Sequence, residues 1–439
     1  MLSKEEGNAS MVRGKHLNLN SRSRPFYFRG CKKVRSTNIE SLPDEMLSEI
    51  LVRVPTDDLC NRAKLVCHRW YHMIHSHAFV NAHFEHNSST NYGLFFSFGY
   101  SDNTLIYASV TKQGRFEMSQ LSRKRSSGSQ TWCGSNGLVL GLFVRNMKQS
   151  LFILNPATKH VFGSSLLFEC ERMFPEAPGF VYQKRFGTRT CNPFDSERVY
   201  QSSCGIAYAA ASMVYKVVQP HGQSYMVYEN NGRRLSTSLH VHLAILTVGV
   251  DDSWRHVQLQ HLPKTFRRLL TQPPLITEGF VHWVWGDAPS QRVWTMNVET
   301  EIIAQTDFPL PQGRHVTYDS SYLSTGRYLT FLFGLGRQCW EIWEMKPETG
   351  EWRKQSYIKF EDEQVKRCKR WRPNDYDEYI LFPRGWVKYP EVCAFLVGWS
   401  YMIVFYNILS HEIVSTMEIP CSYFSAFPHR NTLAWLSYA

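Results

Sequence analysis

The sequence predicts a small all-α module followed by a large all-β domain, for which a β-propeller is the first choice and a β-sandwich-type repeat the alternative. Three observations predict this: residues 40–83 carry apolar residues at helical spacing, residues after about 90 form short aromatic and β-branched runs broken by turn residues, and one hairpin pattern recurs along those runs. We expect three parts: a basic arm over 1–38, a helical module over 39–84 and a β domain over 85–439.

The composition is that of a folded protein. Of the 439 residues, 43% are hydrophobic and 20% are charged, and an aromatic content of 14% favours β structure. No apolar run approaches the ~18 residues of a membrane helix, so no membrane span is expected. The eleven cysteines are an odd number without a CxxC pair, which predicts reduced thiols in an intracellular protein of the cytoplasm or nucleus.

The N-terminal arm is strongly basic. Between Gly7 and Ile39 there is no acidic residue. The basic residues there are Arg13, Lys15, Arg22, Arg24, Arg29, Lys32, Lys33 and Arg35. A solvated disordered tail is the simplest interpretation, so nucleic acid is not expected as the main partner. A nuclear import signal, a nucleic-acid contact and an organelle transit peptide are the alternatives.

The first helix of the module is predicted from its ends and its apolar face. Pro43 suits a first helical position, and Asp44 and Glu45 favour the positive end of the helix. Pro55 ends the helix, because it lacks an N–H group. The apolar face consists of Met46, Leu47, Ile50, Leu51 and Val54.

A second helical stretch begins after Pro55. Thr56 is expected to cap it, with Asp57 and Asp58 in the first turn. Its apolar stripe contains Leu59, Ala63, Val66, Cys67, Trp70, Met73 and Ile74. About 45 residues in two or three short helices are too few to bury a good core alone. The module is therefore expected to complete its core on a partner protein.

The stretch "LVCHRWYHMIHSHAF" raises the question of a metal site. His68 and His72 stand four residues apart, as in half of an HExxH zinc site, but no glutamate lies between them. We expect the histidines on an exposed helix face, with Trp70 and Ile74 pointing inward and Cys67 as a structural thiol. The sequence predicts no metal site and no cofactor.

The β region contains a recurring hairpin. The pattern is a strand, a turn with Asn or Lys, a Thr or Ser, and another strand. Its copies are "LFILNPATKHVF" with Asn155, "VWTMNVETEIIAQ" with Asn297, "IWEMKPETGEW" with Lys346, "IVFYNILSHEIV" with Asn407, and a weaker "ILTVGVDDSWRHV" with Gly249.

The spacing of these copies predicts the architecture. The steps are 249−155 = 94, 297−249 = 48, 346−297 = 49 and 407−346 = 61 residues. We interpret the first step as two units of 47 with a poorly matching unit between them. A strand-rich unit of roughly 50 residues is typical of propeller blades, and roughly six or seven irregular, kelch-like blades fit after residue 90.

The β region offers no convincing catalytic set. It has neither a GxSxG elbow nor a phosphate-binding GxxxxGK[ST] loop. Cys133 in "CGSNG" is interpreted as part of a tight turn rather than as a nucleophile. His282 is expected to be a packed strand residue, and Asp251 and Asp252 are expected in a turn. The basic run "VKRCKRWR" at 365–372, with Trp371, is interpreted as a charged loop. The chain is therefore not expected to be an enzyme.

The helical stretch "LPDEMLSEILVRVP…LVCHRW" resembles an F-box, the motif that docks onto the Skp adaptor of cullin–RING ubiquitin ligases. The resemblance implies partner binding through Leu42, Pro43, Met46, Leu47, Ile50, Leu51, Pro55, Leu65, Val66, Cys67 and Trp70. The stretch between Pro55 and Trp70 is one residue longer than the usual pattern. Since one residue turns a helix by ~100°, we expect a bulge or a shifted partner face there.

The β region resembles the F-box-associated region of plant F-box proteins over most of 130–415. The residues that carry this resemblance are "SNGLVLGLF", "YKVVQ", "DDSWRHV", "GFVHWVW" and "EIWEMKPETGEWRK". "CGIAYAAAS" departs from the usual pattern, so one irregular blade is expected. Together the resemblances imply a substrate receptor of an SCF-type ligase that binds an unknown target through its loops. The alternative is a binding or regulatory protein outside a ligase, which uses the basic arm for nucleic-acid or nuclear contacts.

Overall fold

The computed structural model describes most of the chain from residue 39 onward. The described residues are 39–86, 92–98, 104–111, 113–122, 129–145, 148–158, 160–162, 204–228, 234–270, 272–284, 292–310, 320–336, 338–369, 381–398, 401–419 and 424–434. The basic arm and the long stretch around 165–200 lie outside them. The chain divides into two compact units, 1–47 and 48–439, and every contact between helices and sheets given below lies within the second unit.

The described chain begins with short helices. Their bounds are η1 (Ile39–Ser41), α1 (Asp44–Leu51), α2 (Thr56–Asn61), η2 (Ala63–Leu65), α3 (His68–Ile74) and α4 (His77–His86). The first helix ends before the predicted Pro55, because the amides of Arg53 and Val54 bond three residues back, to Ile50 and Leu51, in a tightened last turn.

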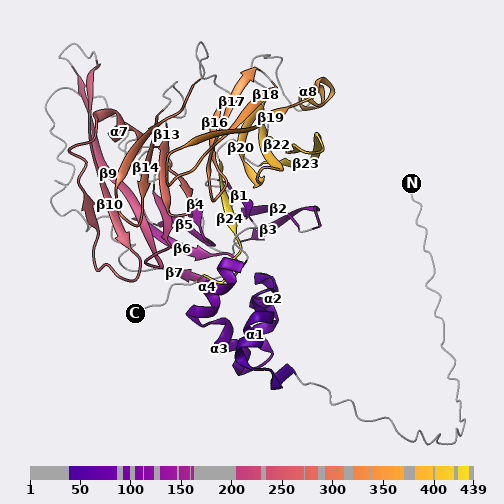
Figure 1. The fold of residues 1–439 in the computed structure, drawn as a ribbon. Helices are drawn as coiled ribbons and strands as arrows, with labels where there is room; N and C mark the ends of the chain where they lie inside the picture. The colour runs from indigo at the N-terminus through magenta and orange to yellow at the C-terminus, as the bar shows by residue number, and fades with distance from the viewer. Residues whose placement is uncertain are drawn as a thin grey trace, which may run out of the picture. The chain divides into compact units, whose positions relative to one another are not determined.

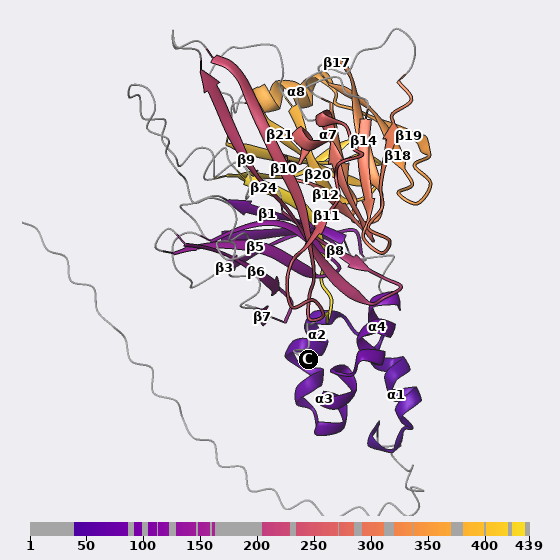
Figure 2. The ribbon, with the colours of Figure 1, turned by 90° about the vertical axis from the view of Figure 1, so that its left-hand side faces the viewer.

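The described strands form six four-stranded antiparallel sheets, shown in Figure 1 and Figure 2. In chain order the strands are β1 (Tyr92–Phe98), β2 (Thr104–Val110), β3 (Phe116–Ser122), β4 (Ser129–Ser135), β5 (Leu138–Arg145), β6 (Lys148–Asn155), β7 (His160–Phe162), β8 (Gly205–Ala209), β9 (Val214–Tyr228), β10 (Arg234–Thr247), β11 (Arg255–Val257), β12 (Leu275–Thr277), β13 (Phe280–Val284), β14 (Arg292–Asn297), β15 (Ile303–Asp307), β16 (Ser321–Ser324), β17 (Leu329–Gly336), β18 (Cys339–Met345), β19 (Trp352–Lys359), β20 (Leu381–Lys388), β21 (Val392–Val397), β22 (Met402–Asn407), β23 (Glu412–Glu418) and β24 (Phe424–Arg430).

The sheets are the blades of a six-bladed β-propeller. The first strand of each sheet contacts the first strand of the next, in the cyclic order β24, β4, β8, β12, β16, β20 and back to β24. Blade 1 has the order β24-β1-β2-β3, and blades 2 to 6 contain β4–β7, β8–β11, β12–β15, β16–β19 and β20–β23. Strand β24 pairs with β1 from Phe424–Phe98 to Arg430–Tyr92, so the last described strand closes the ring. The predicted fold class is confirmed, and the β-sandwich alternative is wrong.

The recurring hairpin of the sequence is the turn between the third and fourth strands of a blade. The Oδ1 atom of Asn297 accepts hydrogen bonds from the amides of Glu299 and Thr300 at 2.8 and 3.3 Å. Asn155 and Asn407 make the same pair of bonds in blades 2 and 6. An asparagine that bonds to the backbone two and three residues ahead imitates a turn, which is the physical reason for the repeat.

Two details of the repeat were predicted wrongly. Blades 2 and 3 are neighbours whose inner strands β4 and β8 touch, so no unmatched unit lies between Asn155 and Gly249. The 94-residue step contains residues 163–203, which lie outside the described residues, and the long pair β9–β10, which runs past its neighbours in Figure 2. Gly249 does not occupy the asparagine position: strand β10 ends at Thr247, and Gly249 lies within the turn at φ 76°.

The core consists of apolar layers between neighbouring blades. One cluster joins blades 2, 3 and 4 through side chains such as Leu140, Val217 and Trp283. Other clusters join blade 4 to 5, blade 5 to 6, blade 6 to 1 and blade 1 to 2, so an apolar layer fills each blade interface. A four-stranded sheet buries both faces in this way only when it has a neighbour on either side.

Three segments of the β domain differ from their predicted structure. The run at 365–372 was expected as a loop, but residues Asp362–Lys369 form helix α8, with Val365 and Cys368 buried in the blade 5–6 cluster; Trp371 lies outside the described residues. Helix α7 (Lys264–Leu269) buries Phe266 against Trp283 and Trp294. The region of "CGIAYAAAS" is not irregular, since β8 pairs with β9 in a continuous register.

None of the helices in the described part of the chain has the length and apolar character required to cross a membrane.

Candidate adaptor-binding site

The predicted apolar face of helix α1 is only partly buried. Leu47 and Leu51, four residues apart, are buried. Met46 and Ile50, each one position earlier, are exposed. Neighbouring positions on a helix differ by ~100°, so one pair can face the chain's own core while the other faces solvent. The helical spacing identified the apolar positions, but it did not distinguish the buried pair from the exposed pair.

The chain between α2 and α3 exposes two further aliphatic side chains. Leu65, at the end of the 3-10 turn η2, is 73% exposed, and Val66, which follows it, is 60% exposed. Leucine and valine are usually buried in folded proteins, so two adjacent, largely exposed ones mark a candidate interaction surface.

An interruption of the helix places Leu65 and Val66 in solvent. Helix α2 ends at Asn61, and Arg62 has φ −129° and ψ −60°, outside the helical region. Cys67 is extended, at φ −162° and ψ 168°, before α3 begins at His68. The stretch between Pro55 and Trp70 is therefore a broken helix, in which α2, the 3-10 turn η2 and α3 follow one another.

Thr56 does not cap α2 as predicted. Pro55 occupies the N-cap position without a side-chain bond, and Thr56 is the first helical residue. Its buried hydroxyl instead donates a hydrogen bond to the carbonyl oxygen of Asn431, at 3.0 Å. No sequence pattern predicts this contact, because its partner lies in the last described segment.

The predicted partner-binding residues differ in their accessibility. Pro43, Met46, Ile50, Pro55, Leu65 and Val66 are exposed; Leu42, Cys67 and Trp70 are half-buried; Leu47 and Leu51 are buried. Tyr71, which was not predicted, is also exposed and stacks on His75 at 4.1 Å between ring centroids. The buried pair is suited to a structural role, and the exposed residues remain available to a partner.

The histidines of α3 follow the expected pattern of exposure. His68 and His72 are exposed, with ring centroids 6.3 Å apart, while Ile74 is buried and Trp70 half-buried. Within the described part of the chain, no group of three or more His, Cys, Asp or Glu side chains could hold a metal ion. His83 of α4 is buried and lies 3.0 Å from the carbonyl oxygen of Val54; burial lowers its pKa, which favours a neutral ring.

The residues of the β domain that were considered as catalytic candidates are packed or hydrogen-bonded within strands and turns. Cys133 is buried in β4, and burial raises its thiol pKa to about 12, so the reactive thiolate is disfavoured. His282 lies 2.8 and 2.9 Å from the hydroxyls of Thr277 and Thr295, so it is a packed strand residue as predicted. Asp251 lies in the predicted turn and accepts a hydrogen bond from the amide of Thr247 at 2.7 Å.

Comparisons with known proteins identify the family of the helical part. Residues 39–83 match the family described as F-box-like. No curated protein matches the chain. Solved structures with some likeness include a nidogen–laminin complex, at 8% identity and TM-score 0.39, covering 77% of this chain and all of that one. Apo AztD from Citrobacter koseri has 9% identity and TM-score 0.30, covering 77% of this chain and 98% of that chain. The lectin SapL1 with α-methyl fucoside has 10% identity and TM-score 0.31, covering 76% and 97%. The chain thus combines an F-box-like domain at residues 39–83 with a six-bladed β-propeller.

Proposed function

We propose that this chain is the substrate-receptor subunit of an SCF-type E3 ubiquitin ligase. Its F-box-like domain binds a Skp-type adaptor and, through it, a cullin–RING ligase. The propeller holds a protein target, which the ligase ubiquitinates for degradation by the proteasome. The chain itself is a non-catalytic adaptor that raises the concentration of its target near the ubiquitin-carrying subunit.

The observation that carries this proposal is the exposure of Leu65 and Val66 inside a domain of the F-box-like family. Burying a leucine or valine side chain in an interface is worth ~1.5–3 kcal/mol. Ile50, which is also exposed, adds a third aliphatic side chain from α1. A partner that covers these side chains gains the apolar contact that the chain leaves unmade.

We further propose that the propeller is an F-box-associated region of the plant type, with kelch-like blades and loops that bind the target. The ordered motifs between 130 and 415 support this assignment. Such a receptor works inside the cell, in the cytoplasm or nucleus. The identity of the target depends on loop surfaces, for which the sequence contains no motif.

The test is calorimetric titration of the full-length chain with a purified Skp adaptor. Leu65→Asp and Val66→Asp should each weaken binding by about tenfold or more, since ~1.4 kcal/mol corresponds to tenfold in affinity. The propeller turns supply matched controls: Leu409 is 71% exposed and Val250 is 65% exposed. Leu409→Asp and Val250→Asp should leave the affinity unchanged. Equal effects of the two sets, or no adaptor binding by the unaltered chain, would contradict the proposal.

A further inference from the structure

The segment that follows the ring-closing strand is held by blade 2. We call residues 430–434 the C-terminal strap; Arg430 ends β24 and residues 431–434 continue from it. The hydroxyl of Thr432 donates to the carbonyl oxygen of Asn136 at 3.0 Å. The side-chain amide of Asn155 donates to the carbonyl oxygens of Thr432 and Ala434 at 3.0 and 2.5 Å. The strap is therefore fixed to two turns of blade 2.

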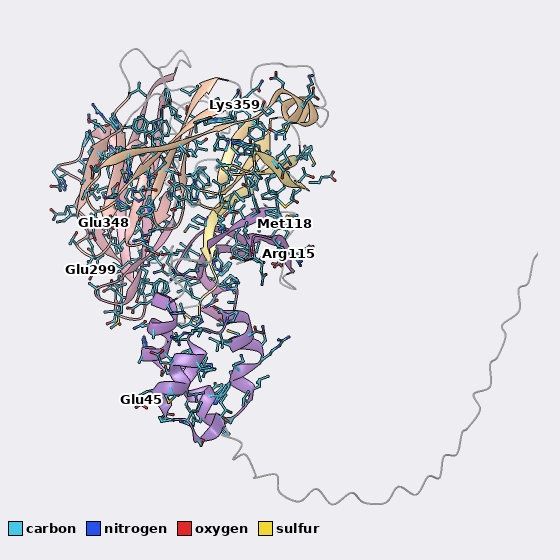
Figure 3. The ribbon with its side chains drawn as sticks, turned by 45° about the vertical axis from the view of Figure 1, so that its right-hand side comes forward. Glu45, Arg115, Met118, Glu299, Glu348 and Lys359 are labelled. Atoms are coloured by element: carbon cyan, nitrogen blue, oxygen red, sulfur yellow. The ribbon has the colours of Figure 1, made fainter. Side chains whose placement is uncertain are left out.

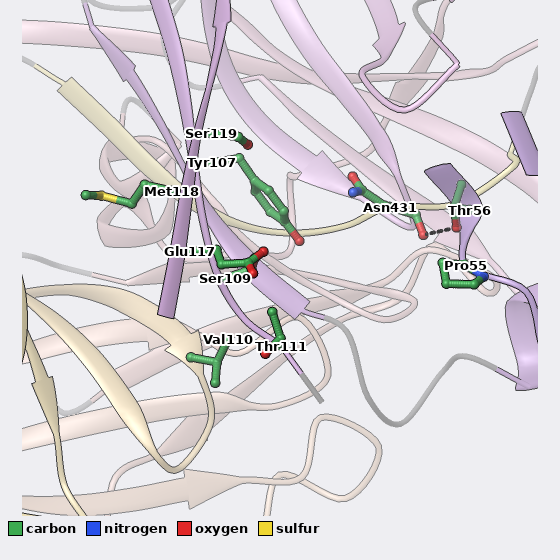
Figure 4. Close-up of a pocket in the computed structure, with 10 residues that line it drawn as sticks. All are labelled: Pro55, Thr56, Tyr107, Ser109, Val110, Thr111, Glu117, Met118, Ser119 and Asn431. Carbon is green, nitrogen blue, oxygen red and sulfur yellow. Dashed lines mark hydrogen bonds between the residues drawn. The ribbon is translucent and has the colours of Figure 1, made fainter. Parts of the chain in front are cut away.

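The same strap contacts helices α2 and α4. The hydrogen bond from Thr56 of α2 to the carbonyl oxygen of Asn431 is drawn in Figure 4. It borders a cavity of about 470 Å³ whose lining includes Pro55 and, on strands β2 and β3, Tyr107 and Glu117. From α4, the ring of Phe84 lies with its centroid 3.7 Å from the guanidinium carbon of Arg430.

Arg430 joins helix α4 to the turn before β13. Its side chain is 1% exposed, and its guanidinium lies 3.9 Å from the Oε1 atom of Glu278, in the turn that precedes β13. A cation over an aromatic ring is attracted to the negative ring face, and this attraction is strongest where water is excluded. Loss of the groups around a buried charge costs free energy, because the charge is then left uncompensated. The contact with Arg430 therefore favours one position of the Phe84 ring, and so of helix α4.

Helix α4 also contacts the connection between α1 and α2. His83, beside Phe84 in sequence, contacts the carbonyl oxygen of Val54 in the connection between α1 and α2. The strap thus reaches α2 directly, through Thr56, and the α1–α2 connection indirectly, through α4. The exposed Leu65 and Val66 follow α2 in the chain.

We infer that the C-terminal strap has two roles: β24 closes the propeller, and the residues after it fix α2 and α4 to the propeller, with Arg430 as the positioning residue. The side on which Leu65 and Val66 face a partner is then set by the contact between Arg430 and Phe84. Only the use of this orientation, to present a bound target to a ligase, rests on the proposed function; the orientation itself does not.

The test measures the distance between the helices and the propeller in the full-length chain. Spin labels are introduced through non-natural amino acids at Asn61, the end of α2, and at Glu348, in the turn before β19; both residues are exposed, and Glu348 is labelled in Figure 3. Pulsed electron paramagnetic resonance should give a single narrow distance for the unaltered chain. Phe84→Ala should lose the single narrow distance, whereas Phe84→Tyr, which keeps the ring, should retain it.

Arg430→Gln is the reciprocal variant and should also lose the single distance. If it fails to fold, Phe84→Ala still tests the inference, since Phe84 is only half-buried and lies on a surface helix. An unchanged, narrow distance in a folded Phe84→Ala variant overturns the inference. Adaptor affinity, measured on the same proteins, separates the two proposals. A chain that binds no adaptor but shows the expected distances contradicts the proposed function alone, and the reverse result contradicts only the role of the strap.

Discussion

The ammonium group of Lys216 in blade 3 lies 2.8 Å from the Oε1 atom of Glu301 in blade 4, and the lysine side chain is almost fully buried. Arg255 of β11 contacts the same carboxylate at 2.7 Å, so two cations of one blade share one anion of the next. Glu301 adopts the left-handed conformation, at φ 59°, as the fourth residue after Asn297 in its turn. The turn chemistry of the repeat therefore also aims a carboxylate across a blade interface.

Glu301→Gln should lower the free energy of unfolding by about 1–3 kcal/mol, because a charged hydrogen-bond acceptor of a buried lysine is lost. The hydrogen bond from Arg255 is the main reason why the pKa of Glu301 is lowered to about 2. The folded state holds the carboxylate, so this stabilisation is present above pH 4.5 and is lost as the pH falls from about 4.5 towards 2. Urea unfolding at pH 7 and pH 3 checks both statements. Glu348→Gln, in the equivalent turn of blade 5, is the control; it should change the free energy of unfolding neither at pH 7 nor at pH 3.

Acidification should destabilise the fold through two buried histidines. Burial lowers the pKa of His282 and of His429 to about 3, from an ordinary value of 6.5. Below pH 6.5 the unfolded chain binds protons that the folded chain excludes, so stability falls as the pH drops from 6.5 towards 3. At pH 5 each histidine should cost about 2 kcal/mol.

Urea unfolding at pH 7.5, 6 and 5 measures this dependence. His282→Gln should reduce the loss of unfolding free energy between pH 7.5 and 5, whatever its effect on stability at pH 7.5. His68→Gln, on the exposed face of α3, should leave the decline as it is. If the free energy of unfolding fell equally with pH in His282→Gln and in the unaltered chain, His282 would not contribute to the acid destabilisation.

The repeated asparagine should contribute more in blade 2 than in blade 6. Asn407→Ala removes the acceptor for the amides of Leu409 and Ser410 at an exposed turn and should cost about 1 kcal/mol. Asn155→Ala removes the equivalent acceptor and also the donor to the strap carbonyls, at a fully buried site, and should cost about 3 kcal/mol. Equilibrium denaturation of the two variants gives the comparison, and equal losses would show that Asn155 does not support the strap.

Gly137→Ala should be more damaging than another glycine substitution with the same backbone strain. Gly137 and Gly114 have φ 85° and 79°. An added Cβ at Gly137 would lie 1.8 Å from the hydroxyl oxygen of Thr432, whereas one at Gly114 would meet nothing within 4 Å. Gly114→Ala should therefore cost about 1 kcal/mol from strain alone, and Gly137→Ala about 2 kcal/mol more.

A second substitution tests the origin of that difference. Thr432→Ala removes the hydroxyl that is nearest to the added methyl group, so it should recover part of the loss in the double variant with Gly137→Ala. Thermal unfolding, with Thr432→Ala alone as the reference, measures the recovery. Strictly additive losses would place the clash elsewhere.

The propeller could be predicted because its repeat is local chemistry. An asparagine that accepts two backbone hydrogen bonds needs only the next three residues, so its sequence pattern survives in blades 2, 4 and 6. The blade number could not be read, because spacing alone does not distinguish a missing unit from a lengthened one. The 94-residue step that suggested an extra unit spans neighbouring blades.

The apolar positions of the helical module could be predicted from the sequence, but not which of them are buried and which are exposed. Periodicity identifies apolar positions, whereas the choice between core and surface depends on what packs against them, so Leu47 and Leu51 were grouped with Met46 and Ile50. The contact between Phe84 and Arg430 had no sequence signal at all, because it joins residues from opposite parts of the chain.

Ring closure by β24 has a consequence for synthesis on the ribosome. Strands β1, β2 and β3 emerge early, but the inner edge of β1 finds its partner only after Phe424–Arg430 has been translated. Until then the nascent chain carries Phe95 and Phe96 on an incomplete blade, with backbone groups open to other strands. A premature stop codon between residue 84 and Phe424 would therefore yield a product prone to aggregate, even though it retained the whole F-box-like domain.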